Sequence, residues 1–266
     1  PMAPTPRPIP SALESRAQSD ALVHDPTSGM PRLLEIMARL RDPNGGCPWD
    51  LEQTYASIVP YTIEEAYEVA DAVQREAWDE LELELGDLLL QVVYFAQMAA
   101  EDGRFDFDSI ARKIADKMVD RHPHVFGDET RADTAAQNAA WEVQKASERA
   151  ARGEAGVLDG VAMGLPALTR ALKLQKRAAR VGFDWNDPQA VLAKVAEESA
   201  ELVAARDSGD ADAVEDEMGD LLFVMVNLAR HMGVDPEAAL RRTNGKFTRR
   251  FGQVEDGLAR QGRTPA

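Results

Sequence analysis

Two acidic motifs with the same internal spacing stand out in this sequence, EEAYE at 64–68 and EESAE at 197–201. Each places three carboxylates within about one helical turn, where like charges three or four residues apart repel by roughly 0.2–0.5 kcal/mol per pair. After fifteen further residues, each motif is followed by a second acidic pair, ExxD. The acids that recur at identical spacing are Glu65, Glu68, Glu84 and Asp87 in the first copy and Glu198, Glu201, Glu217 and Asp220 in the second.

This spacing predicts two oxygen-rich metal sites. On a helix, the last two acids of EExxE share one face, as do the two acids of ExxD, and the second pair begins a helix that is apolar almost all round. Carboxylates that converge beside such a buried helix need protons, basic partners or a cation. Four oxygen donors of this kind suit Mg²⁺, with Mn²⁺ as the alternative. A carboxylate-bridged di-iron bundle requires two Glu-x-x-His motifs, which neither copy contains.

Further features accompany each acidic set. A K-x-x-x-R motif recurs as Lys117 with Arg121 and as Lys246 with Arg250, and indicates cations suited to phosphate groups. The glycine inside each ExxD pair, Gly86 or Gly219, costs about 1 kcal/mol relative to alanine in a helix interior, so we expect it to allow close helix approach. The copies differ three residues before EExxE, where the second has Lys194 and the first has Tyr61.

The composition is that of an acidic globular protein. The chain has 266 residues, of which 44% are apolar, and its 46 acidic and 30 basic residues give a net charge of −16. This charge disfavours a nucleic acid polymer as partner. The single cysteine, Cys47, allows no intrachain disulfide and indicates a reducing compartment, for which we expect the cytoplasm. No run reaches the roughly 18 apolar residues of a membrane helix, and no signal peptide is recognised.

The periodicity predicts an all-α fold, because apolar residues recur at three- and four-residue spacing and no convincing alternating strand is found. Helices are expected at 30–41, 56–76, 78–101, 107–121, 134–152, 165–181, 188–206, 210–232 and 236–259. The duplication predicts two related helical domains. We expect a disordered tail at 1–28, a first domain at 29–126, a helical linker at 127–160 and a second domain at 161–266.

The chain resembles the MazG-type nucleoside triphosphate pyrophosphohydrolases, specifically the long members with two tandem MazG domains. The phrases that carry the resemblance cover nearly the whole chain after about residue 29. They are GCPWDLEQTYASIVPYTIEEAYEVADA at 46–72, ELGDLLLQVVYFAQMA at 84–99, RHPHVFGD at 121–128, KLQKRAARVGFDW at 173–185 and NGKFTRRF at 244–251. The resemblance implies tandem four-helix-type bundles that dimerise, and Mg²⁺-dependent hydrolysis of NTPs or dNTPs to the monophosphate and pyrophosphate.

The resemblance also suggests roles for individual residues and points to the second copy as the catalytic one. The implied metal ligands are Glu198, Glu201, Glu217 and Asp220, with Glu65, Glu68, Glu84 and Asp87 as candidates in the first copy. Glu197 is a candidate for orienting or deprotonating water, and Lys194 for contacting phosphate beside it. Further phosphate contacts are expected from Lys246, Arg249 and Arg250. Trp49 and Trp185 lie in loops just before the two acidic helices. A tryptophan in such a loop more commonly anchors the loop to the core, and stacking on a nucleobase is the alternative. Trp185 is kept as a candidate for substrate binding.

Two other functions remain open at this stage. Guanosine alarmones could replace nucleoside triphosphates as substrates of the same site. From a different class, a non-catalytic helical scaffold could carry acidic clusters that merely hold metal. The apolar helices at 86–99 and 219–232 predict a homodimer, as the resemblance does.

Overall fold

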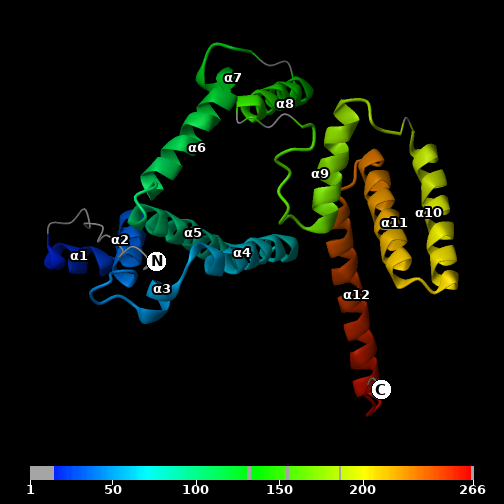
Figure 1. Ribbon diagram of the computed structural model, residues 1–266. Helices are drawn as coiled ribbons and strands as arrows, with labels where there is room; N and C mark the ends of the chain where they lie inside the picture. The colour runs from blue at the N-terminus through cyan, green and yellow to red at the C-terminus, as the bar shows by residue number, and fades with distance from the viewer. Residues whose placement is uncertain (1–14, 131–132, 152, 154–155, 186, 265–266) are drawn as a thin grey trace. The chain divides into compact units, whose positions relative to one another are not determined.

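The computed structural model describes residues 15–130, 133–151, 153, 156–185 and 187–264. Within these residues it contains twelve α-helices and no strand, so the predicted all-α fold is confirmed (Figure 1). The chain divides into two compact units, at 1–136 and 137–266. Helix α8, Thr134–Ala151, runs across this division.

The N-terminal unit is built around a hairpin of two long helices. Its helices are α1 (Arg16–Val23), α2 (Met30–Leu40), α3 (Pro48–Glu52), α4 (Tyr55–Arg75), α5 (Trp78–Glu101), α6 (Phe107–Arg121) and α7 (Pro123–Phe126). Helix α4 begins at Thr54, whose side chain accepts from the Ser57 N–H in a capping box. It ends at Glu76, which takes a left-handed conformation with φ of 58°, and α5 begins two residues later. The sharp turn places α4 and α5 side by side.

The core of this unit joins α2, α4 and α5 through Met37, Ile58, Val93, Tyr94 and Met98. A polar network at its edge fixes the loop that leads into α4. The Tyr94 hydroxyl donates to Asp50 Oδ1 at 3.0 Å, and Arg41 pairs with Glu101 at 2.7 Å. Because Asp50 lies in α3, this network holds α3 against α5.

The C-terminal unit contains a similar hairpin of two long helices, with one helix before it and one after it in the sequence. Its main helices are α9 (Ala167–Arg180), α10 (Pro188–Ser208), α11 (Ala211–His231) and α12 (Pro236–Ala259). Three aspartates, Asp187, Asp210 and Asp235, cap α10, α11 and α12 by accepting backbone N–H groups. Gly209 closes α10 in the left-handed region, with φ of 76°. Helices α10 and α11 pack together, and α9 packs against α11.

The C-terminal unit also has a core, made of Leu172, Val191, Val224 and Val226. Helix α12 packs only in part against the other helices of its unit. It contacts α9 and α11, and its C-terminal half extends beyond them (Figure 1).

Some expectations need correction. The disordered tail predicted through residue 28 is wrong for 16–23, which form α1; residues 1–14 lie outside the described part. Ser19 of α1 is buried and donates to Glu35 of α2, a tertiary contact that stabilises a helix too short to form alone. The short helices α3 and α7 were not predicted either. A Cβ added at Gly86 or Gly219 would meet nothing within 4 Å, so neither glycine serves close helix approach within this chain.

One described helix, α5, is long and apolar enough to cross a membrane by length and composition alone. Core helices of soluble proteins pass the same test, and α5 contributes Val93, Tyr94 and Met98 to the core. Packing in the N-terminal unit accounts for part of this apolar character, since 33% of the apolar window is buried.

Candidate metal centres

The first carboxylate cluster lies between α10 and α11. One oxygen each of Glu198, Glu201 and Glu217 can be chosen so that all lie within 4.8 Å of one another. The Glu198 side chain is only 6% exposed, whereas Glu201 faces solvent. Burial raises the pKa of Glu217, and the charges of Glu201, Glu198 and Asp220 raise it further. Three of the four predicted ligands thus converge, whereas Asp220 lies outside this set and acts on Glu217 only through its charge.

Lys194 partly neutralises this cluster. Its Nζ lies 2.7 Å from Glu198 and 3.0 Å from Glu197, so it contacts a predicted metal ligand and the predicted water-orienting residue. Hydrogen bonds to Glu198 and then to Glu197 are the main causes that raise the pKa of Lys194. All three residues lie within about one turn of α10, which is why sequence spacing alone brings them together.

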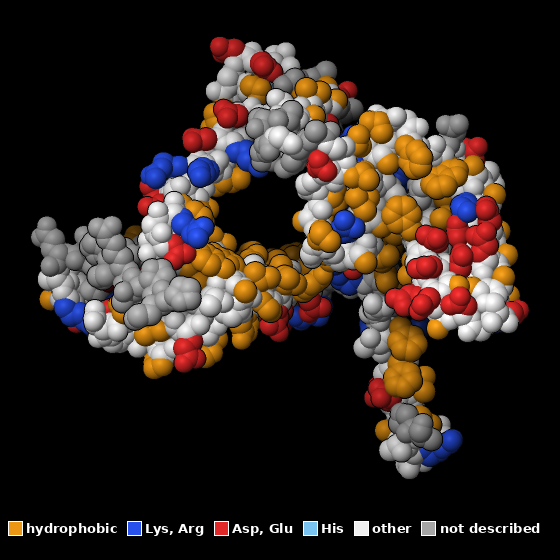
Figure 2. Space-filling view, viewed as in Figure 1, with side chains coloured by type: hydrophobic (Ala, Val, Ile, Leu, Met, Phe, Trp, Pro, Cys, Tyr) orange, Lys and Arg blue, Asp and Glu red, His pale blue; other side chains and the backbone are white. Residues whose placement is uncertain are grey.

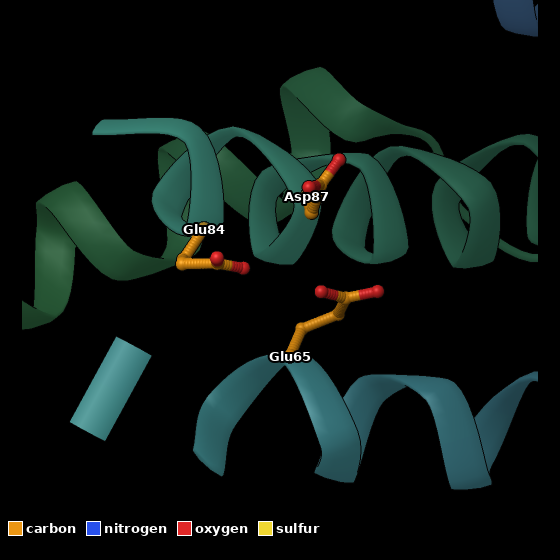
Figure 3. Close-up of side chains that lie close together, drawn as sticks. All are labelled: Glu65, Glu84 and Asp87. Carbon is orange, nitrogen blue, oxygen red and sulfur yellow. The ribbon is translucent and has the colours of Figure 1, made fainter. Parts of the chain in front are cut away.

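The second cluster lies between α4 and α5. Figure 3 shows Glu65 of α4 pointing toward Glu84 and Asp87 of α5, and one oxygen of each lies within 4.8 Å of the others. Burial raises the pKa of both Glu65 and Glu84. After burial, the negative charges of Asp87 and Glu68 raise the pKa of Glu65 further, and those of Glu68 and Asp87 raise the pKa of Glu84. The first copy thus brings three of its four predicted acids together and leaves out Glu68, whereas the second leaves out Asp220.

These donor sets fit a hard divalent cation. Each cluster consists of carboxylate oxygens on two packed helices, and burial together with mutual repulsion raises the pKa of Glu65 and of Glu217. A divalent cation would replace that repulsion with attraction, and Mg²⁺ or Mn²⁺ prefers such oxygen ligands. Figure 2 shows the acidic side chains gathered over α10 and α11.

The comparisons with known proteins agree with this duplicated architecture. The family described as the MazG nucleotide pyrophosphohydrolase domain matches twice, at 53–126 and 186–254, and each match contains one cluster. The chain belongs to the MazG family. It is 54% identical over 233 residues to the nucleoside triphosphate pyrophosphohydrolase of Escherichia coli K12, which covers 87% of this chain and 89% of that protein. It is also 42% identical over 230 residues to the nucleoside triphosphate pyrophosphohydrolase/pyrophosphatase MazG of Thermotoga maritima, covering 86% and 87%.

The predicted phosphate contacts of the second MazG domain lie apart from its acids within one chain. Lys246, Arg249 and Arg250 are exposed on α12, and none of them pairs with a carboxylate in the described part of the chain. Lys246 and Arg249 line a hollow of about 540 Å³ with residues of α12 and the turn before it. No acid of the cluster lines this hollow.

Two aromatic side chains differ in their surroundings. Trp185 is half-buried in the loop before α10, and its backbone N–H donates to Asp184 at 2.9 Å. Trp49 is 51% exposed and meets Tyr61, itself 41% exposed, edge to face at 6.2 Å between ring centroids. The expectation of a core anchor is therefore wrong for Trp49, because α3 turns the indole outward against α4.

Sequence reasoning also missed the contacts that fix the two loops. Asp184 pairs with Arg230 of α11 and lies 3.4 Å from His231, while Asp50 accepts from Tyr94 of α5. In both units an aspartate beside the loop tryptophan is thus held by the second helix of the acidic hairpin. The shared aspartate in PWD and FDW is the only signal for this tether in the sequence.

Proposed function

We propose that the protein is a Mg²⁺-dependent hydrolase that converts nucleoside triphosphates, NTP or dNTP, to the monophosphate and pyrophosphate in the cytoplasm. The observation that carries this proposal is the cluster of Glu198, Glu201 and Glu217, with Lys194 directly beside it. The names of the Escherichia coli and Thermotoga maritima relatives support the same reaction. A nucleotide-pool role suits a protein whose net charge of −16 disfavours nucleic acid polymers.

The chain's own residues divide the work of the reaction. Glu198, Glu201, Glu217 and Asp220 would hold the cation, which when bound would supply charge at the phosphates and lower the pKa of a water. Glu197 is 57% exposed at the rim of the cluster, where its carboxylate can accept the proton of the attacking water. The water oxygen forms a bond to phosphorus as the α,β-phosphoanhydride bond breaks, one proton of the water passes to Glu197, and the monophosphate and pyrophosphate separate.

Lys194 has two successive partners in this proposal. Without substrate it neutralises Glu198 and Glu197. Once a cation balances the cluster, the ammonium is free to donate to a phosphate oxygen, a charge-assisted hydrogen bond worth about 1.5–3 kcal/mol. Lys194 thus supplies part of the positive charge at the cluster before the cation binds, and contacts the substrate after the cation has bound.

A homodimer accounts for the surface of the C-terminal unit. Phe247 and Phe251 stack on each other at 6.1 Å and are 68% and 45% exposed on the half of α12 that extends outward. Figure 2 shows apolar side chains exposed along this part of α12. We propose that α12 packs on a second copy and brings Lys246, Arg249 and Arg250 to that copy's phosphate site, because they do not meet the acids of their own chain.

A substrate panel tests the function. NTPs, dNTPs and guanosine alarmones are assayed for pyrophosphate release with Mg²⁺, and Glu201→Ala and Asp220→Ala are compared with the unmodified chain. Both acids are exposed, so we expect each variant to keep its helical circular dichroism and to lose pyrophosphate release. Retained activity in both variants would overturn the assignment of the metal site. No turnover of any substrate by the unmodified chain would support the scaffold alternative, and activity confined to alarmones would replace the proposed substrate class.

A further inference from the structure

Two Asn-Gly dipeptides occur in this chain, and the structure gives them different backbone conformations. They are Asn44–Gly45, in the turn between α2 and α3, and Asn244–Gly245, inside α12. Asparagine is among the thermolabile residues. It is lost when the backbone nitrogen of the next residue attacks the side-chain carboxamide, and glycine hinders this attack least because it has no Cβ. The two dipeptides therefore have the same covalent chemistry, and only their conformation distinguishes them.

The turn before α3 leaves Asn44 open to this reaction. Its side chain is exposed and makes no hydrogen bond within the part of the chain that the structure describes. The Asn44 backbone N–H donates to Asp42 Oδ1 at 2.9 Å, which stabilises the turn. Gly45 has a φ of 152°, and apart from its chain neighbours no atom lies within 4 Å of the position that a Cβ would take. The carboxamide of Asn44 and the backbone of Gly45 therefore have free space around them.

The attacking nitrogen is held only weakly in the turn. The Gly45 N–H donates to the Asp42 carbonyl at 3.3 Å, whereas the Gly46 N–H donates to the same oxygen at 2.7 Å. The shorter bond keeps this carbonyl satisfied when the Gly45 N–H is lost. Gly245, by contrast, lies in the middle of α12, where its N–H belongs to the hydrogen-bond ladder of the helix. The helical backbone also holds that nitrogen away from the carboxamide carbon of Asn244.

We propose that Asn44 is a site of spontaneous deamidation and that α12 protects Asn244. The Gly45 nitrogen forms a bond to Cγ of Asn44, and the carboxamide nitrogen takes up the proton of that N–H and leaves as ammonia. Water then opens the cyclic succinimide at either of its carbonyl carbons. The products are aspartate and isoaspartate, in which the chain continues through the side-chain carbonyl. Overall, water is consumed and ammonia is released without oxidation or reduction, and this chemistry is independent of pyrophosphate release.

The isoaspartate product should open the loop that leads into α3. It lengthens the backbone by one carbon just before Gly45 and Gly46, where space is short, because a Cβ added at Gly46 would overlap backbone atoms of Leu40 and Asp42. The next residue, Cys47, is half-buried, and its N–H donates to the Leu40 carbonyl at 2.8 Å. Cys47 is the only cysteine in the chain, so the reactivity of its thiol reports the opening of this loop.

The test follows both dipeptides in one sample. The full chain is kept folded at physiological temperature and mildly alkaline pH in water enriched in heavy oxygen, then digested and analysed by mass spectrometry. We expect the peptide with Asn44 to take up heavy oxygen about tenfold faster or more than the peptide with Asn244, because attack within the helix first breaks a hydrogen bond and distorts the backbone. An isoaspartate-specific methyltransferase should label only the first peptide. In urea, where the structure is lost, the two peptides should react at similar rates.

Asn44→Gln is the matched control, because glutamine keeps the carboxamide but forms the corresponding ring far less readily. After the same incubation, the Cys47 thiol of the unmodified chain should react faster with a thiol reagent than the thiol of this variant. Equal uptake of heavy oxygen at Asn44 and Asn244 in the folded chain, or uptake at neither, would overturn the proposed site. Unchanged thiol reactivity after Asn44 has become isoaspartate would overturn the proposed opening of the loop.

Discussion

Lys194 Nζ lies 2.7 Å from the carboxylate of Glu198, one helical turn away on α10. The Glu198 side chain is 6% exposed, and the Lys194 side chain beside it is 30% exposed. The pair places a positive charge inside a cluster that also suits a divalent cation. Lys194 and the cation therefore compete for the same negative charge, and this competition makes Lys194 sensitive to metal binding.

Substituting this lysine should affect activity and metal response in opposite directions. We expect Lys194→Met to lower the rate of pyrophosphate release by about one to two decades, because a charge-assisted contact of about 1.5–3 kcal/mol is lost. We expect the Mg²⁺-induced rise in melting temperature to become larger, because the cluster has lost its internal cation. Steady-state kinetics and thermal melts with and without Mg²⁺ measure the two effects. Lys194→Arg is the control and should retain part of the activity; an unchanged rate in Lys194→Met would make this residue a surface charge only.

The raised carboxyl pKa values predict how stability depends on pH. Burial and neighbouring acids raise the pKa of Glu65, Glu84 and Glu217 above the ordinary value of 4.5. The folded state therefore binds protons more tightly than the unfolded state, and the contribution of these groups to stability falls as pH rises from 4.5 through their raised pKa values. Without metal, we expect the melting temperature of the unmodified chain to decrease over this pH window more steeply than that of the Glu217→Gln variant.

Metal should reverse that trend, because Mg²⁺ binds the ionised carboxylates. The rise in melting temperature on adding Mg²⁺ should therefore grow as pH increases from about 5 to 7. Differential scanning fluorimetry at fixed ionic strength measures both trends. A Mg²⁺ effect that is independent of pH would argue against binding at these carboxylates.

Much of this architecture follows from local patterns. Helices α4, α5, α10 and α11 begin and end within two residues of the predicted ranges, because their apolar spacing is regular and polar caps or turns mark most of their ends. Both clusters could be predicted as well. Acids three residues apart share a helix face, and a tight turn between two helices brings the two faces together.

Contacts between distant residues could not be read in the same way. Helix α1 depends on the buried bond from Ser19 to Glu35, and the orientation of Trp49 depends on the tether between Tyr94 and Asp50. These pairs are 16 and 44 residues apart, so no helical period relates them. The buried Oε1 of Gln91, which has no hydrogen-bond partner among the described residues, is likewise evident only when the packing around α5 is known.

The exposed aromatic stack on α12 should be needed for dimer formation. We expect the unmodified chain to sediment as a dimer at micromolar concentrations and Phe247→Glu with Phe251→Glu to sediment as a monomer, because two charges would be buried in an apolar contact. Val143→Glu on α8 is the control, since Val143 is 73% exposed and lies outside α12. If Lys246 and Arg250 act on the partner's substrate, the monomeric variant also loses activity. A double variant that stays dimeric would place the interface elsewhere.

The two carboxylate clusters should contribute unequally to hydrolysis. Each gathers three acids, but among the described residues only the C-terminal cluster has a lysine paired with it; in the N-terminal copy Tyr61 cannot neutralise a phosphate. Glu65→Ala with Glu68→Ala should therefore keep most of the pyrophosphate release, whereas Glu198→Ala with Glu201→Ala should leave almost none. Circular dichroism and sedimentation are needed for both variants, because removing the buried Glu198 leaves Lys194 without its closest partner. An inactive N-terminal variant would reassign catalysis to the first copy. Equal losses of about half would mean that the two sites are equivalent and that the lysine does not distinguish them.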